Sequence, residues 1–389
     1  MVLMQLADKP TDTALVVRKT TWLLLAVAFG ALEFFFPRIP LFPWLKPGLA
    51  NSITLIWIIE FGVTDALLFF LLRTWISGFY FGFSFFTLAL SISGGLTATL
   101  VMGLCWNIFG KRRLMGTVGV SIIGALMHNA GQLIAVYYLM AKNMHLFYQL
   151  PVMLIASIVF GGIVGILVPV LLRMLHSEAL PKAILTSRTS LPVATGKATA
   201  ICMLILVVCA VLTVINSMAI LILCAGAAAA TAQLLTRGTL RRLLQPITKF
   251  WLLFVFVACL HLFFSYGTYL PYLPFITREG ATLTLQQWLR LWTWLELSCV
   301  LRYFNFEAVV FGALSRLFPG RQETLYAGIL ALDFFPEVIR KIQIKTRSHW
   351  RVVVRHPIRG SEKALRAIYL TVIAIMSGEK SAADEKYFI

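Results

Sequence analysis

The sequence is poor in charged residues for its length. Asp, Glu, Lys and Arg make up 13% of its 389 residues, and 59% of the residues are hydrophobic. An average soluble domain carries roughly twice that charged fraction. The composition therefore excludes a soluble domain and indicates an all-α polytopic membrane protein that lies in a lipid bilayer.

Acidic residues are especially scarce. There are 16 of them against 34 Lys and Arg, which gives a formal net charge of +18. In a membrane protein such an excess marks cytoplasmic loops and contact with anionic headgroups, so we expect no nucleic-acid partner. The aspartates are dispersed: Asp8, Asp12, Asp65, Asp333 and Asp384. The carboxylate cluster that magnesium-dependent diphosphate chemistry requires is missing.

Other catalytic motifs are missing too. The sequence has no GxxxxGK[ST] phosphate loop, because the stretch from Thr195 to Ala198 lacks both the upstream glycine and the hydroxyl after Lys197. No nucleophile elbow or zinc-ligand spacing occurs. The six cysteines lie in apolar runs without CxxC spacing, which is typical of small core residues. The N-terminus does not resemble a cleavable signal peptide. We therefore expect no enzyme, no catalytic residue, no metal site and no cofactor bound by this chain.

Six apolar segments occupy the first half of the chain. They cover residues 20–36, 49–61, 66–72, 80–108, 119–140 and 150–175, with a short turn at 62–65. A cytoplasmic N-terminus places most Lys and Arg inside, including Lys111 to Arg113, and leaves loops 37–47, 73–80 and 141–149 outside. Glu33 and Glu60 lie within apolar runs and require partners. The sequence predicts a multi-pass protein of the cell membrane with both termini in the cytoplasm.

The segment 119–140 carries three polar side chains in its middle. Gln132 lies four residues after His128 and three after Asn129, so the three side chains form one ridge of a helix. Polar groups at bilayer depth usually face a bundle interior or a cavity. Two interpretations remain open: the ridge binds a substrate, or it only joins two helices.

The second half begins after a Ser-, Thr- and Pro-rich stretch at 177–199, which predicts a cytoplasmic linker. A hairpin of apolar segments, 200–215 and 218–235, turns about Asn216 and Ser217. Residues 249–266 then span outward to a Tyr- and Pro-rich loop at 267–280. The segment 285–306 is amphipathic and either lies in the membrane interface or packs as a long tilted helix. The strongly basic stretch 337–366 is placed in the cytoplasm. We divide the chain into a membrane domain at 1–176, the linker, and a second domain at 200–389.

Several stretches of the first half match a known family. They are KPGLANSITL at 46–55, SISGG at 91–95 followed by Val101 and Met102, GVSIIGALMHNAGQL at 119–133, QLP at 149–151 and GGIVG at 161–165. Over about 160 residues this half resembles the bacterial Gx transporter family, whose members are often labelled heptaprenyl diphosphate synthase component I. The family looks like the substrate-binding (S) component of energy-coupling factor (ECF) transporters, which are six-helix proteins that take up vitamins and their precursors.

The second half is similar, more weakly, to the transmembrane coupling (T) component of the same transporters. The similarity rests on the hairpin at 200–236, the Phe335-Pro336-Glu337 turn and two basic segments at 345–348 and 364–367. T components carry Ala-Arg-small motifs that dock onto ATPases, and the segment Lys345-Thr346-Arg347-Ser348 departs from that pattern at the alanine. The resemblance implies coupling to ATP-binding-cassette (ABC) ATPases through Lys345, Arg347, Ser348 and Arg366, although a basic face on anionic lipid explains these residues equally.

The resemblance also implies that small residues of the first helix face the T component. Ala26 and Gly30, four residues apart, offer such a face, or they are ordinary small residues of a bundle. Asn51 either contacts a polar substrate group or caps its helix. Arg73 either pairs with an anionic substrate or reaches the headgroups. The substrate-binding candidates are thus His128, Asn129, Gln132, Asn51 and Arg73.

Together these features predict a membrane transport protein, an S–T fusion that imports a small molecule with ATP hydrolysed by separate ABC-type ATPase subunits. The rival hypothesis is a membrane-associated component of heptaprenyl diphosphate or quinone synthesis. A membrane scaffold without a ligand is a third possibility.

Overall fold

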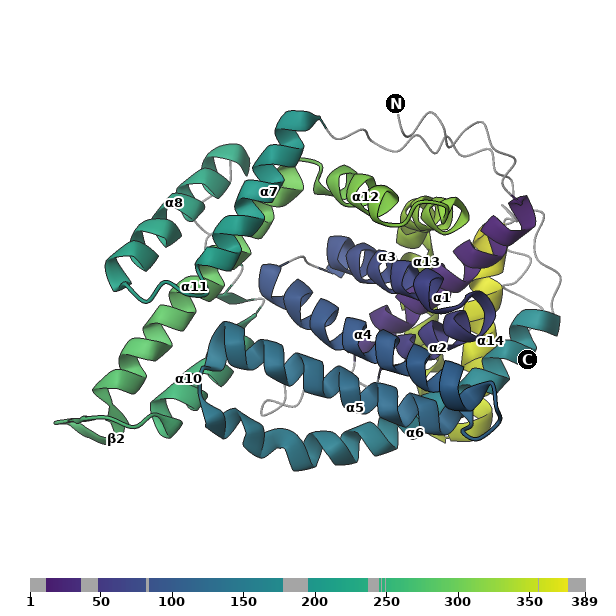
Figure 1. The fold of residues 1–389 in the computed structure, drawn as a ribbon, viewed down its shortest axis with the longest axis horizontal. Helices are drawn as coiled ribbons and strands as arrows, with labels where there is room; N and C mark the ends of the chain where they lie inside the picture. The colour runs from purple at the N-terminus through teal and green to yellow at the C-terminus, as the bar shows by residue number, and fades with distance from the viewer. Residues whose placement is uncertain are drawn as a thin grey trace.

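The computed structural model describes residues 12–35, 48–81, 84–177, 195–236, 245, 247–248, 250–355 and 357–376. It leaves out the side chains at 34–35, 140–141, 175–177, 342–355 and 357–365. The predicted external loop 37–47 and most of the predicted linker lie outside the described residues. Almost all of the described chain is helical, so the predicted all-α fold class is confirmed (Figure 1).

The first half forms six helices: α1 (Thr13–Phe35), α2 (Ala50–Phe61), α3 (Val63–Phe81), α4 (Phe85–Cys105), α5 (Thr117–Val136) and α6 (Leu150–Ser177). Short turns of π-helix, Trp106–Gly110 and Tyr137–Ala141, extend α4 and α5, and a 3₁₀ turn, Met144–Gln149, precedes α6. The prediction for the third segment was wrong in extent. The turn expected at 62–65 consists of Gly62 alone, whose positive φ of 84° suits glycine, and α3 runs on to Phe81.

Helices α4, α5 and α6 form a tightly packed layer (Figure 1). Glycines make the close approach possible, because a Cβ added at Gly161 or Gly165 of α6 would lie 2.7 or 2.4 Å from a backbone Cα of α5. The corresponding glycine on α5, Gly131, faces Thr97 and the backbone of Ser93 on α4. Small residues of this kind are the usual means of close helix packing in membranes.

The second half begins with α7 (Gly196–Val211), which is capped by Thr195, and α8 (Met218–Thr236). The predicted turn about Asn216 and Ser217 lies between them, but α8 packs mainly on α11, and α7 on α12 and α11, rather than on each other. After α10 (Trp251–Phe264), the loop expected at 267–280 contains a small antiparallel ladder of β1 (Tyr269–Leu270) and β2 (Leu273–Thr277). Thr277 caps α11 (Arg278–Tyr303), and α12 (Phe306–Leu317) follows across a bend of 83°.

Helix α11 is a long helix packed among other helices of the chain. It packs against α8, α10 and α7, and the charged side chains of Arg290 and Glu296 are 1% and 4% exposed. This packing favours the long-helix alternative for 285–306. Several of its polar residues bond inside the protein: Gln286 and Arg290 donate to Asn216 in the α7–α8 turn, and Trp294 Nε1 donates to Cys209 O at 3.1 Å.

The last two helices, α13 (Gln322–Arg355) and α14 (Pro357–Met376), return to the beginning of the chain. Helix α13 packs along α1 and α3, and α14 packs against α13 and α1 (Figure 1). The apolar first turns of α13 are buried there, including Leu325, Ala327 and Ala331. The sequence had suggested only a basic cytoplasmic stretch after residue 337, and did not foresee this packing.

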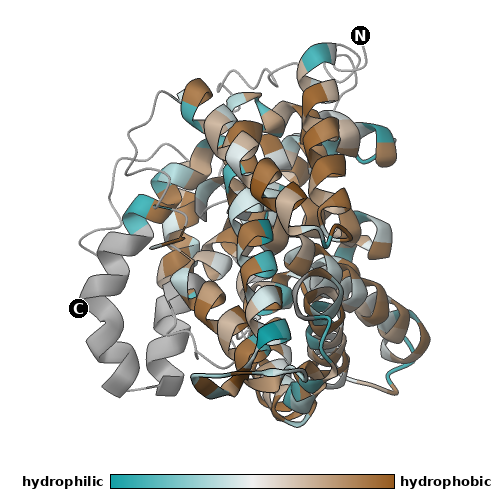
Figure 2. Ribbon diagram, turned by 90° about the vertical axis from the view of Figure 1, so that its left-hand side faces the viewer, coloured by the Kyte–Doolittle hydropathy of each residue, from teal (hydrophilic) through white to brown (hydrophobic). Residues whose placement is uncertain are grey.

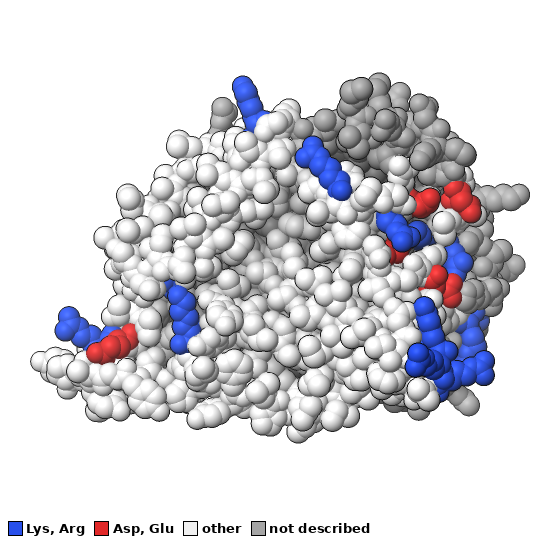
Figure 3. Space-filling view, viewed as in Figure 1, with Lys and Arg blue, Asp and Glu red and all other residues white. Residues whose placement is uncertain are grey.

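Five helices in the described part of the chain are long and apolar enough to cross a membrane, or six if the bent pair α11–α12 is one span. They are α1, α4, α5, α6 and α8. Figure 2 shows predominantly apolar residues along the helices, and Figure 3 shows no charged side chain over the middle of α5 and α6. Of the six predicted spans in the first half, α2 and α3 do not pass this test. Helix α2 has 12 residues, about 18 Å of helix, against a hydrocarbon core of about 30 Å.

Candidate functional site

A small pocket lies between α2, α4, α5 and α6. Its cavity volume is about 20 Å³, room for little more than one water molecule, so the pocket is narrow in this structure. Its described lining combines polar and apolar side chains: Gly48, Asn51, Met102, Ser121, Ala125, His128, Asn129, Ala156, Ser157, Phe160, Gly161 and Val164. Three of the five predicted substrate-binding residues, Asn51, His128 and Asn129, therefore share one pocket.

Asn129 lines the pocket and also forms hydrogen bonds between two helices. Its Nδ2 donates to Ser157 Oγ at 2.8 Å and to Met153 O at 3.4 Å, both on α6. Ser157 Oγ in turn donates to Met153 O. Asn129 thus joins α5 to α6 at the wall of the pocket, as the helix-joining interpretation of the ridge expects; substrate binding by the ridge stays a prediction.

Gln132 packs against α4 and is not part of the pocket lining. A Cβ added at Gly94 of α4 would lie 2.7 Å from Gln132 Cγ, so the glutamine packs directly on the α4 backbone. Gln132 is 7% exposed, and its Oε1 has no hydrogen-bond partner in the described structure. His128 contacts the same glycine with its ring while it also lines the pocket.

Asn51 and Arg73 form a pair beside the pocket. Arg73 Nη2 donates to Asn51 Oδ1 at 3.2 Å, and its guanidinium lies 5.8 Å from the Phe70 ring centre. Arg73 is 9% exposed, so it lies inside the bundle. Asn51 does not cap its helix, because Leu49 occupies the N-cap position. Because Arg73 occupies Asn51 Oδ1, the Nδ2 donor of Asn51 remains for other contacts.

The two half-buried glutamates have the partners that the sequence required. Glu33 Oε1 accepts from the backbone N–H of Ala50 at 3.2 Å, at the start of α2. Glu60 Oε2 forms an ion pair with Arg18 Nη2 at 2.6 Å. Both interactions hold α1 to α2, which carries Asn51.

Ala26 and Gly30 lie in the interior of the α1 packing. Ala26 is fully buried, and an added Cβ at Gly30 would lie 3.8 Å from Ser77 Oγ of α3. Helix α1 as a whole packs along α13 of the second half. The Gly30 position therefore faces α3, and the S–T contact assigned to this pair remains a prediction.

The predicted ATPase-coupling residues lie on the last two helices. The backbone positions of Lys345, Arg347 and Ser348 are helical in α13, but their side chains are outside the described residues. Arg366 lies on α14 and is exposed.

Sequence reasoning missed Ser157 and Phe160 as pocket residues. Both sit in an apolar run of α6, where a single serine carries no signal by itself. It also missed a buried ionic cluster around Asp65, which involves residues from opposite ends of the chain. Among the described residues, no three His, Cys, Asp or Glu side chains are grouped as a metal site would need.

The fold defines this chain as a helical, multi-pass membrane protein. Residues 23–172 match the family model described as heptaprenyl diphosphate synthase component I. The match ends within α6, so it covers the six-helix first half and none of the helices that follow, and it confirms the resemblance of this half to that family. Comparison with curated proteins found no match, and neither did comparison with solved structures.

Proposed function

We propose that this chain is a membrane transport protein of the cell membrane, which combines the substrate-binding and coupling units of an ECF-type importer. The observation that carries the proposal is the pocket between α2, α4, α5 and α6, where Asn51, His128 and Asn129 meet at the depth of apolar helices. Polar groups in such a position favour a substrate or ion pathway. The substrate would be a small, vitamin- or cofactor-like molecule.

The chemistry of the pocket favours a ligand that carries hydrogen-bond acceptors as well as an apolar part. Asn51 retains a donor because its oxygen is bound by Arg73, and Ser121 adds a hydroxyl. Met102, Phe160 and Val164 supply the apolar walls. A few fixed polar groups in a mostly apolar cavity is the usual composition of small-molecule sites.

The test is ligand binding by the purified full-length protein. A thermal-shift screen against vitamins, flavins and isoprenoid precursors should yield at least one stabilising compound, and His128→Ala should abolish that shift while the unliganded protein keeps its melting temperature. Ile134→Ala is the matched control, because Ile134 lies on the same helix and is 52% exposed, outside the pocket lining. A His128→Ala protein with a lower melting temperature and unchanged affinity would contradict this site.

The proposal includes partner proteins. ATP would be bound and hydrolysed by separate ABC-type ATPase subunits, which would contact the basic region of α13 and α14 near Lys345, Arg347, Ser348 and Arg366. Co-purification of such ATPases with the wild-type chain, and their loss from an Arg347→Glu, Arg366→Glu variant, would support the partnership. Loss of the same ATPases from a Lys111→Glu variant alone would place the contact elsewhere.

The description of the matching family favours a second candidate, a component of heptaprenyl diphosphate synthesis. Two observations argue against catalysis by this chain alone. Its aspartates are dispersed, and Asp65 is already bound by Lys19 and Thr324. We expect no prenyl diphosphate synthesis and no ATP hydrolysis by the purified chain with Mg²⁺. Robust chain elongation without a partner would replace the transport proposal by this one.

A further inference from the structure

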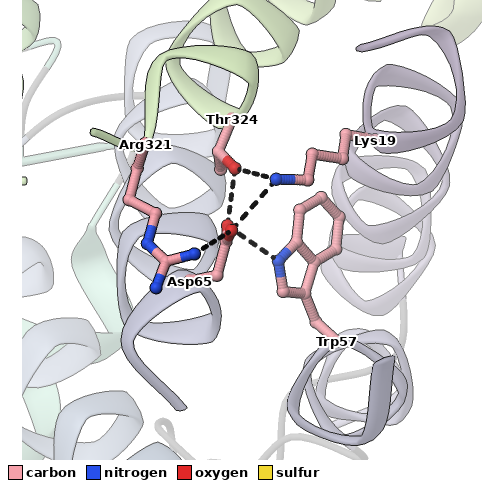
Figure 4. Close-up of polar contacts among 5 residues, drawn as sticks. All are labelled: Lys19, Trp57, Asp65, Arg321 and Thr324. Atoms are coloured by element: carbon pink, nitrogen blue, oxygen red, sulfur yellow. Dashed lines mark hydrogen bonds and ion pairs between the residues drawn. The ribbon is translucent and has the colours of Figure 1, made fainter. Parts of the chain in front are cut away.

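A buried ionic cluster joins the beginning of the chain to α13. Asp65, in the first turn of α3, is 1% exposed and accepts hydrogen bonds from four side chains of three other segments (Figure 4). The donors are Thr324 Oγ1 at 2.5 Å, Lys19 Nζ at 3.0 Å, Trp57 Nε1 at 3.2 Å and Arg321 Nη1 at 3.4 Å. Lys19 comes from α1 and Trp57 from α2, while Thr324 and Arg321 come from α13 and the residue just before it.

Thr324 completes the coordination of both buried ions. Its hydroxyl donates to Asp65 and accepts from Lys19 Nζ at 2.7 Å, so it bridges the acid and the base. Lys19 is 3% exposed and Thr324 is fully buried. A buried ion pair is tolerated only when further hydrogen bonds satisfy its remaining lone pairs and protons. Within the described residues, half of the groups that satisfy Asp65 belong to α13 and its N-terminal flank.

The contact between α3 and α13 continues beyond the cluster. Gly328 of α13 packs on Leu72, since an added Cβ would lie 2.9 Å from Leu72 Cδ2. Farther along, Tyr80 Oη donates to Leu332 O at 2.9 Å, and the Tyr80 and Phe335 rings are 4.7 Å apart. Thr324, Gly328 and Leu332 are spaced by four residues. One face of the first turns of α13 therefore follows α3 along most of the length of α3.

We propose that the first three turns of α13 are permanently docked against the six-helix first half, and that the buried ion pair of the Asp65 cluster fixes their register. The apolar and glycine-mediated contacts supply the packing, and the ion pair fixes the register, because only one alignment brings Thr324 between Lys19 and Asp65. Helix α13 then moves together with α1 and α3. The inference does not depend on transport activity.

The first test is hydrogen–deuterium exchange of the full-length protein. In the wild type, amides of residues 322–332 should exchange as slowly as those in the middle of α1. Asp65→Asn should speed exchange at 322–332 by at least about tenfold, because Lys19 is left buried without its counter-ion. Peptides from α5 and α6 should be unchanged. Exchange at 322–332 that is already fast in the wild type would overturn permanent docking.

The second test distinguishes the Lys19–Asp65 ion pair from a general destabilisation of α3. Asp65→Leu and Lys19→Met should each lower the melting temperature, whereas the double variant should recover most of the loss, since replacing both ions by apolar groups removes the unpaired charge. Glu337→Gln is the matched control: it breaks two exposed ion pairs on α13, with Arg340 and Lys341, and should change neither readout. Additive losses of melting temperature in the Asp65→Leu, Lys19→Met variant would show that the two ions do not act together, and would refute the proposed role of the ion pair.

Discussion

Neighbouring residues of the polar ridge on α5 have different roles. His128 and Asn129 both line the pocket, but Asn129 also donates to Ser157 on α6, and Gln132 turns to α4. Successive residues of an α-helix point in directions about 100° apart. The side chains from His128 to Gln132 can therefore contact two neighbouring helices and the pocket at once. Substitutions of His128, Asn129 and Gln132 should therefore differ in their effects on stability and on ligand binding.

We predict that Asn129→Ala lowers stability more than Ser157→Ala does. Asn129→Ala removes the hydrogen bonds from α5 to α6, and such interhelical bonds contribute about 0.6–2 kcal/mol in membrane proteins. Ser157→Ala removes one acceptor but leaves Asn129 Nδ2 near Met153 O. Melting temperatures of the two variants in the same detergent provide the measurement. Equal destabilisation would mean that the Asn129–Ser157 bond carries the whole effect.

At the scale of elements, the α5–α6 contact depends on glycine at particular positions. Gly165 meets the backbone of Val118, which cannot move aside as a flexible side chain can, while Gly162 has no atom within 4 Å of an added Cβ. The two glycines are three residues apart on one helix but face different surroundings.

Gly165→Ala should destabilise the protein by about 1–3 kcal/mol through overpacking of the two helices. Gly162→Ala should be neutral or stabilising by up to about 1 kcal/mol, because alanine is the better helix former. Thermal unfolding of both variants tests the contrast. If Gly165→Ala were harmless, α6 would have to sit farther from α5 than described.

Helix α11 stabilises the turn between α7 and α8. Arg290 donates to Ile215 O and to Asn216 Oδ1, at the C-terminal end of α7 where backbone carbonyls lack helical partners. Lys142, in the corner between α5 and α6, donates to Thr213 O of the same turn. Burial, with a smaller contribution from Arg290, lowers the pKa of Lys142, as expected where two cations converge on one set of carbonyls.

Arg290→Met should cost about 1–3 kcal/mol, because it leaves acceptors of the turn without donors. Arg302→Met, on the same helix but at an exposed position, should be nearly neutral. Comparison of the two melting temperatures measures the contribution of the turn contact. Equal effects would indicate that Arg290 acts only through its bulk.

On the scale of the whole molecule, the sequence predicted the apolar helices well and the long-range contacts poorly. The segments 119–140, 150–175 and 218–235 correspond closely to α5, α6 and α8, because no charged residue interrupts the middle of any of them. Helix α3 was cut short because Asp65 and Arg73 interrupt its hydropathy, although both are buried. The Asp65–Thr324 bond joins residues 259 positions apart, and a lone threonine carries no signal of such a partner.

The pocket was predictable in part for the same reason. Polar residues in an apolar helix, such as His128 and Asn129, stand out from the sequence alone. Ser157 and Phe160 do not, because serine and phenylalanine are ordinary residues of a membrane helix. The pairing of Asn51 with Arg73 depends on how α2 and α3 fold back about Gly62, and hydropathy does not reveal that geometry.

The orientation in the membrane is the remaining large-scale prediction. Lys111, Arg112 and Arg113 follow α4 and are gathered at one end of the α4–α6 layer, while the β1–β2 hairpin lies at the opposite end of the molecule (Figure 3, Figure 1). Positive residues stay on the cytoplasmic side. We therefore expect the loop at 111–113 and both termini in the cytoplasm, and the hairpin outside.

Two single-cysteine variants test this orientation in intact cells with a membrane-impermeant maleimide. Tyr272→Cys should react from outside, because Tyr272 is 94% exposed at the hairpin tip. Arg112→Cys should react only after the membrane is permeabilised, since both positions are exposed and only the membrane separates them. The parent protein with its six native cysteines supplies the background signal. The reverse pattern would invert the protein in the membrane, and would move the basic part of α13 and α14 to the side where ATPase subunits cannot reach it.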